Sequence, residues 1–162
     1  MREETKITPK PEKKIIGRRE RVSFPELDLE EIEAKIDTGA YTSAIHCSDI
    51  HEESLPDGSR VISFDLLDPS HPQYNHRRFT FTDYTFRDIK SSNGEVQQRY
   101  VIRTRIKFFE EEIEAEFSLS DRSDMKYPVL IGRTLLRGRF IVDVSRKNVA
   151  RKTNIKQKKK HL

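Results

Sequence analysis

The most informative part of the sequence is residues 34–43, Ala34-Lys35-Ile36-Asp37-Thr38-Gly39-Ala40-Tyr41-Thr42-Ser43. Apolar residues alternate with charged ones up to Asp37, which predicts a strand with one face on a core. The chain must then turn at Gly39, and the backbone N–H groups of such a turn can hold a carboxylate at the strand end. A carboxylate fixed in this way suits general acid–base catalysis. Asp-Thr-Gly also occurs as an ordinary turn in which the Asp side chain caps the backbone.

A second short motif of matching type lies downstream. Val129-Leu130-Ile131 is continuously apolar and follows Pro128, which predicts a short strand buried on both faces. Gly132 ends this strand. Arg133–Arg137 then reads as about one turn of helix, which Gly138 stops.

The remaining body of the chain has a period of two. The alternating runs begin at Val22, Ile32, Ile62, Phe79, Tyr84, Tyr100, Ile113 and Phe140. Turn signals separate them, and Asn93-Gly94 is the strongest hairpin signal because a type I′ turn needs positive φ at both central residues. The pattern predicts an all-β domain of about eight short strands and one short helix, either a sandwich or a barrel.

The pairing of Asp37-Thr38-Gly39 with Leu130-Ile131-Gly132-Arg133 resembles the retropepsin-like aspartic proteases. Longer stretches narrow the resemblance to bacterial retropepsin-like proteins associated with RimK-type ATP-grasp ligases, whose members are often labelled ATP-dependent zinc proteases. The stretches that carry it are residues 34–46, 99–104, 118–128, 130–133, 138–140 and 142–145. The resemblance covers about residues 15–145 and implies a closed, retropepsin-like β-barrel of short strands.

The resemblance implies an aspartic-type peptidase or amidase. Aspartic peptidases use two carboxylates that share one proton, and this chain has one Asp-Thr-Gly and room for one lobe. It follows that Asp37 from each subunit of a homodimer would form the dyad. In this scheme Thr38 bonds across the dyad and the Gly39 N–H supports the carboxylate. The expected substrate-binding residues are Ala40, Thr42, Ser43, Ile131, Gly132 and Arg133.

Two further basic residues, Arg103 and Arg105, share one face of a predicted strand. One interpretation is a solvated face paired with the glutamates of residues 110–116. The other is a basic groove for an acidic, glutamylated peptide or protein, because Arg binds carboxylates bidentately. The second interpretation agrees with the implied association with an ATP-grasp glutamate ligase. The same fold could also serve that ligase as a peptide-binding module without catalysis.

Neither a metal nor a nucleotide is expected. His46, Cys47, His51 and Glu52 cluster in sequence, but neighbours on a strand face opposite ways, and His-Glu-x-x-His is absent. The phosphate-binding pattern Gly-x-x-x-x-Gly-Lys is also absent. Asp143 could be a second carboxylate in the same chain, but its place in the alternation favours an ion pair.

The lid of the site has two candidates. One is the polar loop containing Pro69, His71 and His76, and the other is the turn at Ser91–Gly94.

Charge separates the body of the chain from its ends. Of the formal net charge of +4, residues 1–14 carry +2 and residues 145–162 carry +8, which leaves −6 on the 130 residues between them. We expect a disordered arm over residues 1–14, one domain over residues 15–145 and a basic, disordered tail over residues 146–162. The tail is either a solvated extension or a weak contact site for RNA or the ribosome.

The remaining features concern the cellular compartment. No apolar run is long enough for a membrane span, no apolar leader follows Met1, and Cys47 has no partner for a disulfide. These features favour a cytoplasmic protein without a membrane partner.

Overall fold

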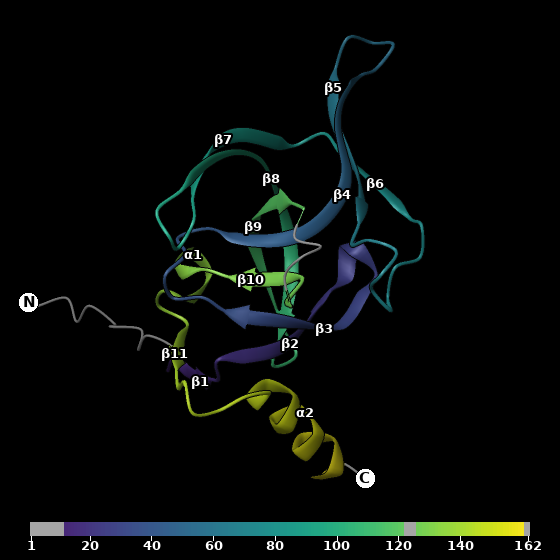
Figure 1. Ribbon diagram of the computed structural model, residues 1–162. Coiled ribbons are helices and arrows are strands. Elements are labelled where there is room, and N and C mark those ends of the chain that lie inside the picture. The colour runs from purple at the N-terminus through teal and green to yellow at the C-terminus, as the bar shows by residue number, and fades with distance from the viewer. Residues whose placement is uncertain (1–11, 122–125, 161–162) are drawn as a thin grey trace, which may run out of the picture.

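The computed structural model describes residues 12–121 and 126–160, which form eleven strands, two α-helices and a short 3-10 helix (Figure 1). The strands are β1 (Lys14–Ile16), β2 (Arg19–Phe24), β3 (Leu29–Ile36), β4 (Ser43–Ser54), β5 (Arg60–Leu66), β6 (Arg78–Phe81), β7 (Tyr84–Lys90), β8 (Val96–Phe108), β9 (Glu111–Ser120), β10 (Val129–Ile131) and β11 (Phe140–Val142). The helices are η1 (Pro25–Leu27), α1 (Arg133–Leu136) and α2 (Val149–Lys160).

The larger sheet closes on itself. Its strands follow the order β10-β3-β2-β8-β9-β4-β5-β6, and β10 also pairs with β4. Six strands therefore form a ring, but the link between β2 and β8 consists of one register pair, Ser23 with Lys107. The prediction of a mostly β, retropepsin-like architecture is confirmed, whereas the closed barrel that we expected is better described as a ring of paired strands.

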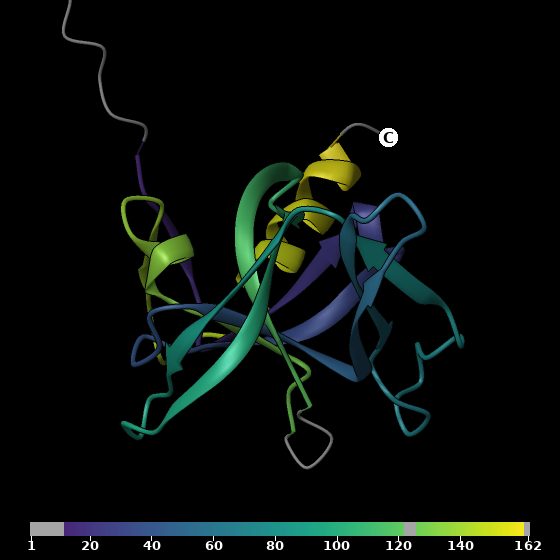
Figure 2. The same ribbon diagram turned by 90° about the horizontal axis from the view of Figure 1, so that it is seen from above.

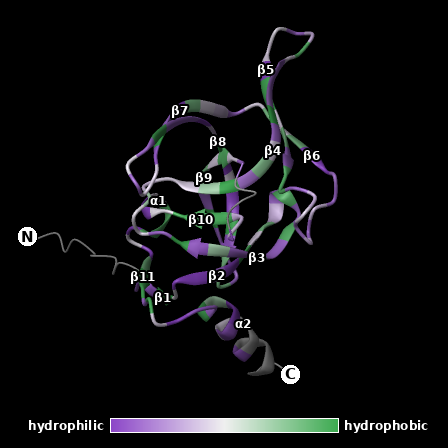
Figure 3. Cartoon of the chain, viewed as in Figure 1, coloured by the Kyte–Doolittle hydropathy of each residue, from purple (hydrophilic) through white to green (hydrophobic). Residues whose placement is uncertain are grey.

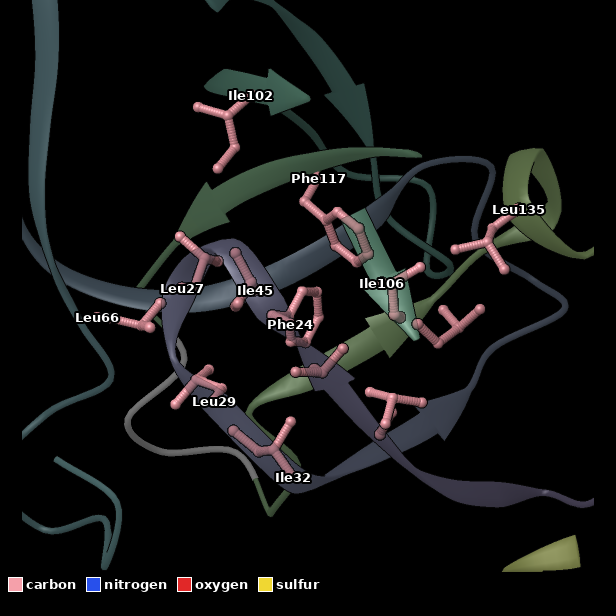
Figure 4. Close-up of a cluster of buried hydrophobic side chains, with 14 of the residues drawn as sticks. Phe24, Leu27, Leu29, Ile32, Ile45, Leu66, Ile102, Ile106, Phe117 and Leu135 are labelled. Carbon is pink, nitrogen blue, oxygen red and sulfur yellow. The ribbon is translucent and has the colours of Figure 1, made fainter. Parts of the chain in front are cut away.

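The core lies inside this ring. Phe24 from β2 meets Phe117 from β9 edge to face, with ring centroids 5.2 Å apart, and Ile45 from β4 packs in the same cluster (Figure 4). These side chains come from strands far apart in the sequence, so their burial holds the ring together. The period-two pattern predicted the inward faces of β2, β3 and β8 correctly.

Two strands differ from the expectation in length or pattern. The first five residues of β4, Ser43–Cys47, are all buried, because β4 is paired with β9 and β10 here and both of its faces are covered. No alternation marks such a segment, and the sequence analysis did not identify it as a strand. At 13 residues, β8 is also longer than the short strands that we expected.

The C-terminal segment is a helix and not the disordered tail that we expected. The carboxylate of Glu20, which is fully buried, accepts the N–H groups of Val149 and Ala150 at 3.0 and 2.9 Å, and this caps the start of α2. Ala150 is buried against the body. The packed domain therefore extends beyond residue 145, and a second helix joins the one that we predicted.

The expected arm over residues 1–14 lies mostly outside the described residues, which begin at residue 12. Its last residue, Lys14, starts β1, which pairs in parallel with β11 in a separate two-stranded sheet. Among the described residues, no helix is both long enough and apolar enough to cross a membrane.

Candidate active site

The position of Asp37 is set by three strands. The short strand β10 lies between β3 and β4, parallel to β3 and antiparallel to β4. Ile131 at the end of β10 pairs with Ile36, and its carbonyl oxygen accepts the Asp37 N–H at 2.8 Å. Asp37 therefore begins where a doubly buried strand ends, and its backbone is anchored to that strand.

Gly132 is packed too closely for any larger residue. A Cβ at this position would lie 2.9 Å from the Ala40 carbonyl oxygen and 2.9 Å from the carbonyl carbon of Thr42, both of which are backbone atoms. The Gly132 N–H donates to the Ser43 hydroxyl oxygen at 2.9 Å. The residue after β10 thus touches both ends of the turn that follows Asp37, which explains why the two motifs occur together.

The start of α1 completes this support. The Arg133 N–H donates to the Ala40 carbonyl at 2.8 Å, and the Arg133 guanidinium donates to the Thr38 carbonyl at 3.0 Å. Arg133 also lies over the ring of Tyr41, 5.7 Å from its centroid. Three consecutive residues, Ile131 to Arg133, therefore support the backbone of the Asp37 turn through hydrogen bonds.

The Asp37 carboxylate accepts one hydrogen bond on each oxygen. The Gly39 N–H donates to Oδ1 at 3.1 Å, and the Ser92 hydroxyl donates to Oδ2 at 2.8 Å. Ser92 belongs to the tip of the β7–β8 hairpin, 55 residues away in sequence. Within the described residues, therefore, neither hydrogen-bond donor to Asp37 is another carboxyl group.

Asp37 lies in a groove of about 560 Å³. One wall comes from the Asp37 turn and its neighbours, including Ala40, Thr42 and Leu130. The opposite wall comes from the hairpin tip, residues 89–93 and Glu95. Ser120 at the end of β9 and Asp121 just after it also line the groove. Of the two lid candidates, the structure places the Ser91–Gly94 turn over the carboxylate.

The expected site residues divide into two groups. Ala40 and Thr42 line the groove beside Asp37. Ser43 and Ile131 are fully buried, and with Gly132 they pack against the turn on the side away from the groove, where they support its backbone.

Arg103 and Arg105 do not reach the Asp37 groove. Arg105 lies 3.6 Å from carboxylate oxygens of both Glu26 and Glu112, and Arg103 lies 3.3 Å from Glu116. This is the paired strand face of our first interpretation. Arg103 does line a second cavity of about 260 Å³, and Thr42 lines both cavities.

The histidine and cysteine cluster does not converge on a point. His46 is buried and its Nε2 lies 2.5 Å from the Asp68 carboxylate, while His51 pairs with Asp49 at 2.6 Å. Cys47 is fully buried, and its burial raises the pKa of the thiol well above its usual range. In residues 12–121 and 126–160 no group of three or more His, Cys, Asp or Glu side chains could hold a metal ion, so this cluster does not fit a zinc site.

Asp143 forms the ion pair that its place in the alternation favours. Its carboxylate lies 3.5 Å from Arg146, and it also accepts the Ser145 hydroxyl at 2.6 Å. The hydrogen bond from that hydroxyl lowers the pKa of Asp143. These partners occupy the carboxylate away from the Asp37 groove.

Sequence analysis did not name Lys35, Lys90 or Arg99 as site residues, although all three line the groove. It included Ser92 only within the Ser91–Gly94 turn, one of two lid candidates, and the structure places the Ser92 hydroxyl on Asp37. The basic groups of the groove come from β3, β7 and β8, and only the register of these strands brings them to one place.

A search of protein families matches residues 15–153 to the RimB-like family, described as retropepsin-like aspartic endopeptidase RimB. Curated relatives include proteins named probable alpha-L-glutamate ligase from Shewanella halifaxensis, 37% identical over 135 residues, and from Desulfotalea psychrophila, 38% identical over 135 residues. Each match covers 81% of this chain but 28% of the relative, so the chain spans about a quarter of their length.

A solved structure has the same fold. The crystal structure of a Legionella pneumophila protein with unknown function superposes with a TM-score of 0.66 at 22% identity, over 86% of this chain and 99% of that one. At this identity the likeness bears on the fold alone.

Proposed function

The chain belongs to the RimB-like family of retropepsin-like aspartic endopeptidases, and from this premise we propose that it is an aspartic-type peptidase or amidase. Its catalyst is a pair of Asp37 carboxylates, one from each subunit of a homodimer. The observation that carries the proposal is the position of Asp37, at a strand end in a groove of about 560 Å³ with a hydroxyl of the hairpin tip on its outer oxygen.

The proposed mechanism needs a second copy because, in the described residues, the groups that hydrogen-bond to Asp37 are the Gly39 N–H and the Ser92 hydroxyl, and neither is a carboxyl group. Two carboxylates close together cannot both ionise easily, so they share a proton, and the pair titrates as a unit. One carboxylate then takes a proton from water while the other donates a proton to the carbonyl oxygen of the scissile bond. Thr38 is exposed beside Asp37, and in the proposed dimer it bonds across the dyad.

The small β1–β11 sheet offers a surface for this dimer. Ile15 and Ile141 are 44% and 52% exposed, and Val144, just beyond β11, is 74% exposed. The sheet lies at the same side of the molecule as the end of β3, from which Asp37 follows (Figure 1). Pairing of this sheet with its copy would bury apolar surface.

Acidic substrates suit the charges near Asp37. Lys35, Lys90 and Arg99 line the groove, and their positive charges exceed those of the acids that share it once Asp37 is set aside for catalysis. The second cavity, which Thr42 joins to the groove, contains Arg87, Arg103 and Arg139. A glutamate-rich peptide that extends through both cavities would contact these basic side chains along its length. Its carboxylates would compete with Glu116 for Arg87 and Arg103, which pair with Glu116 in the structure.

The test is hydrolysis of peptides with and without an oligoglutamate tail, measured from pH 4 to pH 7 for the wild type and Asp37→Asn. We expect cleavage of the tailed peptide, with a loss of at least about 10³-fold in the variant. Thermal unfolding and sedimentation should show that the variant keeps the fold and the dimer. Equal cleavage of the two peptides would contradict a preference for acidic substrates. Equal activity of the wild type and Asp37→Asn would contradict the catalytic role of Asp37.

A second function is a peptide-binding module that serves an ATP-grasp glutamate ligase. The names of the curated relatives favour it, since segments similar to this chain make up 28% of proteins named as ligases. If the chain is such a module, the wild type and the Asp37→Asn variant should bind the tailed peptide equally well, and neither should hydrolyse it. Binding measured alongside cleavage therefore separates the two functions.

A further inference from the structure

Six exposed basic side chains gather where the C-terminal helix meets β2. We call this set the basic face; it consists of Arg18, Arg146, Lys147, Arg151, Lys152 and Lys156. They come from both ends of the sequence, on the segment before β2, the segment before α2 and α2 itself. Their proximity follows from the fold and not from one run of lysines.

Backbone hydrogen bonds join the two segments. The Arg18 N–H donates to the Arg146 carbonyl at 2.9 Å, and the Asn148 N–H donates to the Arg19 carbonyl at 3.0 Å. A Cβ on Gly17 would lie 2.3 Å from the Arg146 carbonyl oxygen, so this approach requires glycine. Arg18 is therefore held beside Arg146 and Lys147.

Glu20 holds the helix on the same segment. Its carboxylate accepts the Gly17 N–H at 2.8 Å in addition to the N–H groups of Val149 and Ala150. A fully buried carboxyl group that accepts three backbone N–H donors holds the two segments together. The start of α2 thus has a fixed position beside the segment that carries Arg18, and the exposed basic residues of α2 follow directly from it.

This face retains most of its positive charge. Arg146 and Arg151 form long, exposed pairs with Asp143 and Glu31 at 3.5 and 3.6 Å, which contribute little at the surface. The other four members form no ion pair within the described parts of the chain. Residues 15–144 carry a net charge of −6, so the positive potential of the protein is concentrated at the basic face and attracts anions to it.

The surroundings of the face indicate the kind of ligand. The coloured part of α2 is mostly hydrophilic (Figure 3), and among the residues that the structure describes, no large exposed apolar side chain belongs to α2 or β2. Insertion into a membrane needs an apolar helix face, and base stacking needs exposed aromatic rings. An extended acidic peptide would need a groove to bind in. Neither the Asp37 groove nor the second cavity includes a residue of the basic face, so these cavities do not favour a peptide as its ligand.

We propose that the basic face binds the phosphate backbone of a nucleic acid and does not read its bases. Exposed Lys and Arg charges neutralise phosphates and release counterions, which is sufficient for binding without sequence preference. The face lies apart from the tip of the β7–β8 hairpin in two perpendicular views (Figures 1 and 2). A nucleic acid bound there leaves the Asp37 groove open, while Arg18, which donates to the Val144 carbonyl, places one edge of the face beside the surface proposed for the dimer.

The first test is the salt dependence of binding to a labelled 20-nucleotide RNA and to DNA of the same sequence. We expect RNA and DNA to bind within a few-fold of each other, with a steep negative slope of log K against log salt. Lys147→Gln with Lys152→Gln should reduce the magnitude of that slope by about 1.4, since each phosphate contact on a single strand contributes about 0.7. The control pair, Arg60→Gln with Arg77→Gln, removes two exposed charges elsewhere and should leave the slope unchanged.

Equal slopes in the two double variants would overturn the proposal. A preference of more than tenfold for one nucleic acid or sequence would also overturn it, as would competition by oligoglutamate at the same concentration of charge.

The second test asks whether binding requires α2 to be held on the body or depends on net positive charge alone. Glu20→Gln makes the local charge more positive by one unit, so simple attraction predicts tighter binding. A Gln amide cannot accept all three backbone donors, and release of α2 from the body should instead weaken binding about five- to tenfold. Thermal unfolding confirms that the variant is folded. Tighter or unchanged binding by a folded Glu20→Gln protein would contradict the fixed face.

Discussion

The β4–β5 and β7–β8 hairpins end in the same five-residue turn, at residues 55–59 and 91–95. In each turn the N–H of the first residue donates to the carbonyl of the fifth, at 2.7 Å and 2.8 Å respectively. The fourth residue is a glycine with positive φ, Gly58 at 86° and Gly94 at 91°. The β4–β5 tip extends away from the body, whereas the β7–β8 hairpin curves back over it (Figure 1).

The two turns differ most at their second position, which is Pro56 in one tip and Ser92 in the other. Ser92 reaches the Asp37 carboxylate, and its Cβ lies 3.4 Å from the place that a Cβ on Gly39 would take. The same local chemistry therefore builds a solvent-exposed tip and a lid. The pairing of the strands that flank the turn determines whether the tip is exposed or covers the site. In the β7–β8 hairpin, the Ser92 hydroxyl makes the contact with Asp37.

Of the changes in the two turns, Ser92→Ala should have the largest effect, and the quantity it lowers is kcat/KM. A hydrogen bond to a charged group contributes about 1.5–3 kcal/mol, and in this open groove we expect the lower end, a loss of about tenfold in kcat/KM. The control is Ser91→Ala in the same turn, because the Ser91 hydroxyl donates to Asn93 and not to Asp37. Equal losses in the two variants would show that the Ser92 contact has no special role.

A smaller effect should follow when alanine replaces the glycine of either tip. Neither glycine has an atom within 4 Å of an added Cβ, so the cost is conformational and amounts to about 1 kcal/mol in each. Gly58→Ala and Gly94→Ala should therefore lower Tm by a similar amount, about 2–4 °C. Activity should fall in Gly94→Ala alone. A loss of activity in Gly58→Ala would mean that the outer tip also contributes to the site.

The smallest effect concerns pH. The Ser59 hydroxyl and N–H donate to Asp57 and lower the pKa of that carboxyl, while the corresponding residue of the lid is Asn93, which does not titrate. A carboxyl with a lowered folded-state pKa stabilises its turn above the unfolded value, about 3.9, and loses this contribution as the pH falls through the folded value. Acid should therefore loosen the outer tip and spare the lid turn.

This difference can be measured from the amide chemical shifts of Gly58 and Gly94 between pH 2 and pH 6. We expect the Gly58 shift to titrate below pH 4, and Asp57→Asn should abolish that titration. Asn93→Asp should transfer a similar titration to Gly94. A Gly94 shift that follows the same curve as Gly58 in the wild type would contradict the assignment.

Local patterns predicted much of this fold. Asn93-Gly94 indicated a hairpin, Val129–Ile131 a doubly buried strand and Arg133–Arg137 a helical turn, because each depends on neighbours in sequence. The strand over Ser43–Cys47 was missed, since burial on both faces removes the alternation that marks a strand. The helix α2 was missed because its composition is that of a solvated tail, and its anchor, Glu20, lies 129 residues away.

The site was predictable to a similar degree. Asp37 and its support by Leu130–Arg133 follow from two sequence motifs. The lid could not be chosen from sequence. Sequence also left open whether Arg103 and Arg105 line a groove or pair with glutamates, and in the structure they pair with glutamates. Which side chains share a groove depends on the register of β7, β8 and β9, and a period-two pattern carries no information on register.

Subunit mixing between the wild type and Asp37→Asn tests whether the two chains of a dimer share one catalytic dyad. If the dyad needs one Asp37 from each subunit, only wild-type dimers are active. Equal amounts of the two proteins, allowed to exchange subunits, should then reduce the activity per wild-type chain by about half, and a large excess of the variant should abolish it. Activity that stays constant per wild-type chain at every mixing ratio would show that a single Asp37 is sufficient and would contradict the shared dyad.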